Sequence, residues 1–508
     1  MRPASCAPPA GQPAAGALLM RGIVLPLAAG AGAVFGFAPF YFWPAPIISL
    51  AVLMWTWQAS GSPRQAFLSG LAFGLGYFLT GVSWVFVSLH YFGSMPAVLA
   101  AIATFLFCLY LALFFAGAGW ITARLTSAGS APRLAAAAAA IALFEWLRGW
   151  LFTGFPWLNL GTSQAPDGPL AGWAPYVGNY GVTLLVAAVA ALVLARPVPR
   201  RVPMLRYAAA VGLMLAGLGL GRIEWTQPAG PAVAMALLQG NVPQELKWRE
   251  DVRTQTLLGY RDMIFAARAR VVVIPETALP AFLDQLPAEY LEGIRAHARA
   301  EGKEVLLGVV EREFRGDAFT YYNSLVNLTG AGGAFRKYHL VPFGEFIPPG
   351  FRWVLGVLKI PMSDFSRGSP AQPPLLAAGI RFGVAICYED IFGEELISQL
   401  PAAQILVNVS NDAWFGKSFA AEQHLQSSQM RALETGRWVV RSTNTGATAA
   451  VRPDGRIEAR LPWFTAGTLT VAVTPMQGLT PYARAGNYPA VALAFVLLAV
   501  AVWRSRKA

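Results

Sequence analysis

Long apolar stretches, separated by short polar or Pro/Gly breaks, fill the first 220 residues of the chain. A helix needs about 20 apolar residues to cross a bilayer, so these stretches predict a membrane-embedded bundle. Eight spans are expected, at residues 19–38, 44–60, 66–89, 96–121, 134–153, 172–195, 205–221 and 488–503. Three prolines crowd the junction of the first two spans and leave open a broken or re-entrant pair: Pro39, Pro44 and Pro46.

The composition excludes an ordinary soluble enzyme. Only 13% of the 508 residues are charged and the mean hydropathy is +0.47, whereas soluble domains carry about 25% charged residues. The net charge of +12 would suggest nucleic-acid binding, but residues 225–487 hold 25 Lys and Arg against 24 Asp and Glu. The other 14 basic and 3 acidic residues lie in the apolar part. There they report membrane orientation and do not form a nucleic-acid surface.

Basic residues in alternate loops predict the orientation, because Lys and Arg in short loops stay on the cytoplasmic side. They lie in the second, fourth and sixth loops: Arg64; Arg124 and Arg133; Arg196, Arg200, Arg201 and Arg206. Both termini are therefore expected in the cytoplasm and residues 225–487 on the opposite side. In a bacterium this describes a multi-pass protein of the inner (cytoplasmic) membrane with a periplasmic domain.

Four regions follow from this pattern. We expect a Pro-rich, disordered tail at 1–18, a seven-helix bundle at 19–224 and a catalytic domain at 225–487. A last membrane helix with a basic cytoplasmic tail completes the chain at 488–508. The first helix is expected to remain uncleaved, since no convincing small-residue cleavage site precedes a soluble domain.

Residues 225–487 differ in character from the rest. Short apolar runs typical of buried strands recur at 232–239, 270–275, 304–310, 324–329, 381–388, 404–410 and 438–444. Amphipathic helical stretches lie between several of them, at 249–269 and 393–400. This alternation predicts a mixed α/β domain.

Three chemically complementary residues lie in this α/β region. Cys387 and Glu276 each follow an apolar strand, and Lys337 lies between them in the sequence. A thiol is mostly protonated at neutral pH, so a nucleophilic cysteine needs a base or a nearby cation. Glu276 is a candidate base and Lys337 a candidate stabiliser of an oxyanion.

Histidine, the usual partner of a catalytic cysteine, is scarce. The chain has four histidines, scattered singly, which disfavours a metal site built from several of them. His339 and His424 remain the only plausible partners for a conventional Cys-His enzyme. The other cysteines, Cys6 and Cys108, lie in different environments and offer no disulfide framework.

The flanking sequences resemble the nitrilase (carbon-nitrogen hydrolase) superfamily. The similar segments are PETALP around Glu276, RKYHLVPFGEFIP around Lys337 and AICYEDIF around Cys387, followed by SNDAWFG and QMRALETGRWVVRSTNTG. The resemblance extends over 232–475 and implies an α-β-β-α sandwich with a Glu-Lys-Cys triad. It also implies that Glu345 aids the triad.

The whole chain resembles the bacterial apolipoprotein N-acyltransferases, membrane-embedded members of that superfamily. Seven spans, an exported nitrilase-like domain and a final span match their architecture, as do residues 144–161 and 237–248. The resemblance implies that Cys387 takes an acyl chain from a membrane phospholipid as a thioester. The acceptor is the α-amino group of the S-diacylglyceryl-cysteine that begins an apolipoprotein. No cofactor, no metal, no nucleic acid and a monomer are expected, and Tyr388 and Glu389 would shape the pocket.

Several residues are candidates for lipid contact. Trp248 is either a mobile gate or a core residue, and Arg148 binds a lipid phosphate or pairs with Glu145. Aromatic residues at the outer end of the fifth span either line a lipid path or form an interfacial belt: Trp146, Trp150, Phe152, Phe155 and Trp157.

Two other functions are compatible with parts of this pattern. A membrane-tethered amidase or nitrilase would use the same triad but would need a path for water. A transporter would use the exported domain for binding alone, but ion-coupled transporters commonly carry charges at the midplane of the membrane. Glu145 and Arg148 are the only charged residues well inside the expected spans, which disfavours the transporter.

Overall fold

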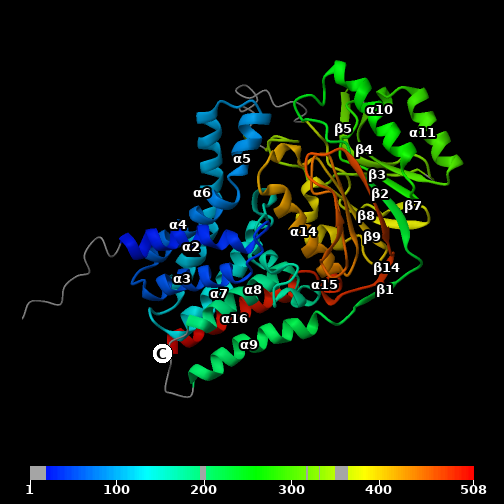
Figure 1. Cartoon of the computed structure of the whole chain (residues 1–508). Helices are drawn as coiled ribbons and strands as arrows, with labels where there is room; N and C mark the ends of the chain where they lie inside the picture. The colour runs from blue at the N-terminus through cyan, green and yellow to red at the C-terminus, as the bar shows by residue number, and fades with distance from the viewer. Residues whose placement is uncertain are drawn as a thin grey trace, which may run out of the picture.

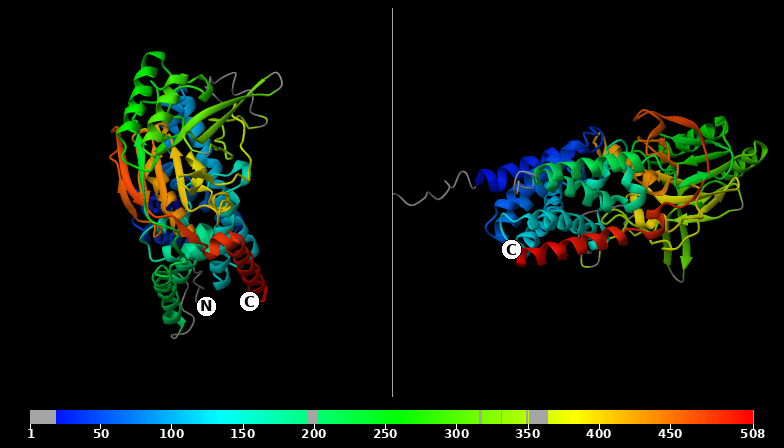
Figure 2. Two further views of the ribbon diagram at one scale, coloured as in Figure 1. Left: turned by 90° about the vertical axis from the view of Figure 1, so that its right-hand side faces the viewer. Right: turned by 90° about the horizontal axis from the view of Figure 1, so that it is seen from below.

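The structure, a computed structural model, describes residues 19–194, 202–315, 318–330, 332–348, 350 and 364–507. The tail expected at 1–18 lies outside them, as do Arg196, Arg200 and Arg201 of the sixth loop. Figure 1 shows a helical part beside an α/β part, and Figure 2 shows the same division from below. The chain enters the α/β part from helix α9 (Val202–Leu220) and leaves it into helix α16 (Tyr488–Lys507).

Apolar helices occur where the spans were expected. Besides α9 and α16, the helical part contains α2 (Leu25–Ala33), α3 (Pro44–Ala59), α4 (Pro63–Gly81), α5 (Trp84–Val87), α6 (Ala97–Leu125), α7 (Ala131–Arg148) and α8 (Ala174–Leu194). Within the described residues, three helices are long and apolar enough to cross a membrane: Ala97–Leu125, Ala171–Leu194 and Tyr488–Lys507. Two further apolar helices are shorter, Met20–Gly36 and Met204–Leu220. The count of eight spans therefore stays a prediction.

Two expected spans differ from the structure. The stretch at 66–89 is broken, because Pro63–Gly81 and Trp84–Phe92 meet at an angle of 49° and would form one bent span. The stretch at 134–153 ends early: α7 stops at Arg148, and Phe152 adopts a left-handed φ of 52° that no helix continues.

Arg133 was expected in a loop but lies buried in the first turn of α7. Its guanidinium donates to the carbonyl oxygens of Trp57 and Ser60, both at 2.9 Å. These carbonyl oxygens lie at the carboxyl end of α3, where the helix itself offers them no partner. The long apolar stem of Arg133 lets the side chain be buried while its charged end binds them. Arg133 therefore binds a helix end inside the protein.

Glycines allow close packing of the first membrane helices. A Cβ on Gly30 of α2 would lie 1.9 Å from the Phe73 carbonyl oxygen of α4, and one on Gly76 would lie 2.0 Å from the Leu27 oxygen. Small residues at such crossings let helix backbones approach where no hydrophobic effect drives association.

The α/β part is a two-sheet sandwich, and all seven expected strands are confirmed. Within the described residues, one six-stranded sheet has the order β13-β2-β3-β4-β5-β6 and the other β12-β11-β10-β9-β8-β7. The first sheet comprises β2 (Val233–Gln239), β3 (Val271–Ile274), β4 (Glu304–Arg315), β5 (Ala318–Asn327), β6 (Ala334–Arg336) and β13 (Gly467–Val473). The second comprises β7 (Leu375–Ala377), β8 (Ile380–Ile386), β9 (Ile405–Ser410), β10 (Val439–Thr443), β11 (Ala449–Val451) and β12 (Ile457–Arg460).

Helices cover the outer faces of both sheets. Helices α10 (Glu250–Ala266) and α11 (Ala288–Ala300) bury Tyr260 and Ile294 against the first sheet. Helices α13 (Gly393–Ile397) and α14 (Ala420–Thr435) pack Leu396 and Leu425 against the second. Between the sheets lies a core of Val, Ile and Leu from both. The four layers form the expected α-β-β-α sandwich.

Helix α14 also contacts the bundle, and all but one of its residues are buried. The Trp157 indole donates to Gln423 Oε1 at 2.8 Å, and Gln423 Nε2 donates to the Gly81 carbonyl at 3.2 Å. One turn further along, Gln426 accepts from the Ala38 N–H at 2.8 Å. Figure 1 shows α14 between the bundle and the sheets. A polar seam of α14 therefore joins the two parts.

Candidate active site

Cys387 lies where β8 ends and a short 3₁₀ turn, Cys387–Ile391, begins. Its φ of 55° is left-handed, an uncommon conformation for a residue other than glycine. Such strained positions persist where the surrounding structure holds them, and they cluster at active sites. The strand and the turn thus deliver the thiol to the edge of the sandwich.

Glu276 and Lys337 come to the same place from the other sheet. Glu276 follows β3 after one proline, and Lys337 follows β6 directly. Both side chains are buried, and Lys337 Nζ lies 3.3 Å from Glu276 Oε1. Asn323 of β5 and the backbone N–H of Asn411 donate to the two oxygens of Glu276, at 2.7 and 2.9 Å.

Electrostatics connect this pair to the thiol. Burial raises the pKa of Cys387 well above its ordinary value; Glu276 adds to the rise and Lys337 opposes it. The resting thiol therefore holds its proton and needs a base. Burial would lower the pKa of Lys337, but Glu345, Glu276 and Cys387 outweigh that effect and raise it. Lys337 is consequently a permanent cation beside the thiol.

Glu345 binds the same ammonium. Its Oε1 accepts from Lys337 Nζ and from Asn323 Nδ2, both at 2.9 Å. Its Oε2 accepts from the Val341 N–H at 2.8 Å. The structure thus brings four predicted residues into contact or electrostatic range: Glu276, Lys337, Cys387 and Glu345.

Glu389 joins the two segments that carry Lys337 and Cys387. Its carboxyl group accepts hydrogen bonds from the backbone N–H groups of Tyr338 at 2.7 Å, His339 at 2.9 Å and Ile386 at 2.7 Å. Burial raises the pKa of Glu389 to about 8, although these hydrogen bonds act in the opposite direction. Glu389 therefore fixes the position of the lysine relative to the nucleophile.

Tyr388 packs beside the nucleophile. It is buried, with its ring 5.1 Å from the Phe392 ring and 5.4 Å from that of His339. Burial raises the pKa of its hydroxyl group far above the physiological range. Tyr388 is therefore uncharged at neutral pH, and its role in shaping the pocket stays a prediction.

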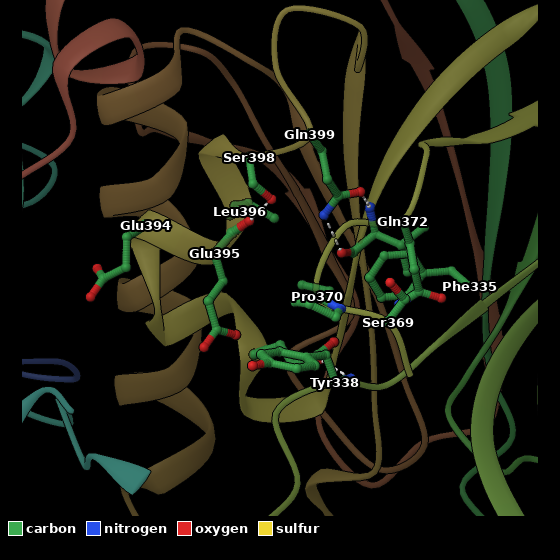
Figure 3. A pocket seen from close by; sticks show the side chains of 13 residues that line it. Phe335, Tyr338, Ser369, Pro370, Gln372, Glu394, Glu395, Leu396, Ser398 and Gln399 are labelled. Atoms are coloured by element: carbon green, nitrogen blue, oxygen red, sulfur yellow. Dashed lines mark hydrogen bonds between the residues drawn. The ribbon is translucent and has the colours of Figure 1, made fainter. Parts of the chain in front are cut away.

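Glu389 also lines a cavity of about 220 Å³. Tyr338, Ser369, Pro370 and Gln372 line it together with residues of β8 and α13. Figure 3 shows Glu395 extending toward the Tyr338 ring and Gln399 at the far side. Gln399 exchanges two hydrogen bonds of 2.8 Å with the backbone of Val384 in β8.

The two histidines considered as partners of Cys387 are engaged elsewhere. His424 contacts Asp390 at 2.7 Å and Asp412 at 3.1 Å, one through each ring nitrogen. His339 Nδ1 lies 2.6 Å from Glu395 Oε1. This geometry favours Glu276 over either histidine as the base. Among the described residues, no group of three or more His, Cys, Asp or Glu is placed to hold a metal ion.

Three further residues were predicted to contact lipid. Arg148 is buried and donates to the Trp157 carbonyl and to Asn159 Oδ1, both at 2.8 Å. Trp146 is half-buried against Trp150 in the bundle. Trp248 is 44% exposed in a turn before α10. Their roles in substrate binding stay predictions.

Asn323 and Asn411 contact the triad but were not identified from the sequence. Asn323 lies inside strand β5, in the segment YYNSLVN, where a buried amide needs partners. Asn411 lies in SNDAWFG, one of the segments that carry the resemblance. Two features of the sequence could have pointed to them: a polar residue within a strand for Asn323, and a motif without an assigned role for Asn411.

The chain is similar over nearly its whole length to curated proteins. Residues 29–192 match the family profile "Apolipoprotein N-acyltransferase N-terminal domain", and residues 234–482 match "Carbon-nitrogen hydrolase". An apolipoprotein N-acyltransferase of Nitrosomonas europaea is 47% identical over 479 residues, covering 94% of this chain and 96% of the relative. One of Ralstonia nicotianae is 45% identical over 498 residues, covering 95% and 94%.

Among solved structures, the NitFhit protein of C. elegans aligns with 48% of this chain and 61% of its own, at 19% identity and a TM-score of 0.37. The family profiles and the full-length relatives, together with the sandwich and the site at its edge, identify this chain as a member of the apolipoprotein N-acyltransferase family.

Proposed function

We propose that Cys387, Glu276 and Lys337 form the catalytic triad of a phospholipid:apolipoprotein N-acyltransferase. The observation that supports this most is the meeting of Glu276 and Lys337, 3.3 Å apart and both buried, in electrostatic range of the Cys387 thiol. A base, a cation and a nucleophile in one buried site are the groups that acyl transfer requires.

In the first step Cys387 Sγ attacks the carbonyl carbon of a phospholipid acyl ester while Glu276 takes the thiol proton. Lys337, the cation in electrostatic range of the thiol, stabilises the oxyanion that forms. The C–O bond of the ester then breaks, and the proton held by Glu276 passes to the departing alkoxide. The products are a lysophospholipid and an acyl thioester on Cys387.

In the second step the α-amino group of an S-diacylglyceryl-cysteine attacks the thioester carbonyl. Free α-amino groups have a pKa near 7.7–8.0, so an appreciable fraction is neutral at physiological pH. Glu276 takes the amine proton and returns it to the sulfur as the C–S bond breaks. An amide forms on the lipoprotein and the thiol is regenerated.

Both substrates are lipids, and this accounts for the membrane bundle. We place the catalytic domain on the periplasmic side of the inner membrane, with both termini in the cytoplasm, because basic residues gather in alternate loops. Strands β1 (Thr226–Pro228) and β14 (Met476–Gly478) pair with each other, which draws the two connections to the bundle together. The triad comes from one chain, so the proposed reaction needs no second copy.

A phospholipid with a labelled acyl chain tests this function. After incubation with the purified full-length protein, peptide mass spectrometry should find a hydroxylamine-sensitive label on Cys387. Adding a diacylglyceryl-cysteine peptide should move the label to its amino group. Cys387→Ser should abolish thioester labelling, whereas Cys108→Ala, a buried cysteine of the bundle, should keep it.

The alternative is a hydrolase with the same triad. Release of the label as free fatty acid, whatever amine is offered, would establish the hydrolase and reject the transferase. An unlabelled Cys387 in an active preparation would reject the triad itself.

A further inference from the structure

Lys247 is a second buried lysine beside the candidate base. It lies in the turn that precedes α10, and its side chain is only 1% exposed. Its Nζ donates to Thr277 Oγ1 at 2.9 Å, and Thr277 directly follows Glu276 in the chain. Neither of the two steps described above uses this ammonium group.

The backbone at Thr277 is strained, and hydrogen bonds hold it in place. Its φ is 43°, a left-handed value that is rare for a residue branched at Cβ. The next residue, Ala278, donates its N–H to the Gly308 carbonyl at 3.1 Å. The hydrogen bond from Lys247 holds the Thr277 side chain itself. Together they fix the direction in which Glu276 leaves the end of β3.

The same turn reaches Glu276 by a second route. Gln244 Oε1 accepts from Asn411 Nδ2 at 2.7 Å, and the Asn411 N–H donates to Glu276 Oε2 at 2.9 Å. The turn that carries Lys247 also carries Trp248, whose ring is partly exposed. The base and this turn are therefore held as one unit.

The charge of Lys247 also acts on Glu276. Burial lowers the pKa of Lys247 to about 8, and the Glu276 carboxylate opposes that fall. The ammonium form therefore predominates at neutral pH. The titratable groups around Glu276 are this ammonium, the Lys337 ammonium, the Glu345 carboxylate and the Cys387 thiol.

We propose that Lys247 is a positioning residue for Glu276: it holds the strained turn after the base and places a cation beside the carboxylate. This inference rests on the proposed function, because it assigns Glu276 as the base of the first step. A cation near a carboxylate favours the charged form, which is the form that accepts a proton.

The test follows Cys387 acylation from a labelled phospholipid in purified full-length protein, from about pH 5 to 9. Lys247→Met should slow acylation by about tenfold or more and move the acid limb of the pH profile upward by about one unit. Lys247→Arg keeps the charge and should hold the limb near its wild-type position. Thr277→Val removes only the acceptor and should slow acylation without moving the limb.

Lys303→Met is the matched control. Lys303 is buried in the same domain but donates to the Phe265 carbonyl at 3.3 Å, away from the triad. It should change neither the rate nor the limb. An unchanged rate and limb in Lys247→Met, or an equal shift in Lys303→Met, would overturn the inference.

Two further outcomes are distinct. If wild-type protein never labels Cys387, the proposed function fails and this inference fails with it. If wild type labels normally and Lys247→Met does not fold, Thr277→Val decides: a wild-type acylation rate in that variant overturns the positioning role.

Discussion

Glu345 holds Lys337 more closely than the candidate base does: its Oε1 lies 2.9 Å from the ammonium, against 3.3 Å for Glu276 Oε1. Two carboxylates therefore share one cation, and Asn323 donates to both of them. Since Glu345 already balances the lysine charge, Glu276 can gain and lose a proton without leaving Lys337 uncompensated.

Glu345→Gln should slow acylation of Cys387 by about tenfold or more, because the neutral amide no longer balances Lys337 and the lysine pairs with the base instead. The measurement is the rate of thioester formation on full-length protein. Glu458→Gln, at an exposed ion pair with Arg452, is the control and should behave as wild type. Full activity in Glu345→Gln would show that the second carboxylate is dispensable.

Gly308→Ala should impair catalysis through the backbone. A Cβ at this position would lie 2.1 Å from the Pro275 oxygen and 2.8 Å from Glu276 Cα, so β4 or the base must move. A shift of about 1 Å at a catalytic group can cost about 100-fold in rate.

The matched control is Gly293→Ala in α11, where an added Cβ meets nothing within 4 Å. There the change should leave acylation intact and raise stability by about 0.5–1 kcal/mol, since glycine is unfavourable within a helix. A wild-type acylation rate in Gly308→Ala would contradict the close approach of β4 to the base.

Glu389→Gln should flatten the pH dependence of stability. Burial raises the folded-state pKa of Glu389 from 4.5 to about 8, so in that window the folded protein keeps a proton that the unfolded chain has lost. The protonated carboxyl group of Glu389 contributes fully to the free energy of unfolding below the unfolded-state pKa. This contribution is lost as the pH rises from about 4.5 to about 8, by at most about 1.4 kcal/mol per pH unit.

Thermal unfolding in detergent at several pH values measures this effect. Wild-type stability should fall more steeply between about pH 5 and 8 than that of Glu389→Gln. The comparison of slopes matters more than either slope, because burial also raises the pKa of Glu434, to about 7. Equal slopes in the two proteins would mean that Glu389 is ionised in the fold.

Gln423→Ala should weaken the junction between the bundle and the catalytic domain. It leaves the buried Trp157 indole N–H without the acceptor it has at 2.8 Å, at a cost of about 1–3 kcal/mol. Equilibrium unfolding in mixed micelles would measure the loss. Gln477→Ala, at an exposed position in β14, should be neutral. Equal stability of the two variants would show that this hydrogen bond of the seam adds nothing to the free energy of unfolding.

Much of the catalytic domain could be predicted because buried strands leave a strong mark on a sequence. Apolar runs that end at Glu276 and Cys387 indicated both strands and the residues that leave them. Their mutual distance could not be predicted by spacing, because β3 and β8 belong to different sheets. That part of the prediction came from the resemblance.

The supporting residues were harder to find, for a physical reason. The roles of Lys247 and Asn323 depend on neighbours far along the chain, and no local pattern encodes those neighbours. The bundle shows the same limit: hydropathy is continuous across residues 66–89, yet the backbone bends by 49° there. A hydropathy profile reports environment and says little about the direction of the chain.

Helix α14 has consequences for how this protein is made. One face of α14 covers the second sheet. Its glutamines form hydrogen bonds to backbone groups of the bundle. A catalytic half produced alone would expose those amides together with the apolar surface around them, and it would lack the contacts that orient the helix. The catalytic half therefore depends on contacts with segments that precede it in the chain, so α14 can pack fully only once those parts of the bundle are in place.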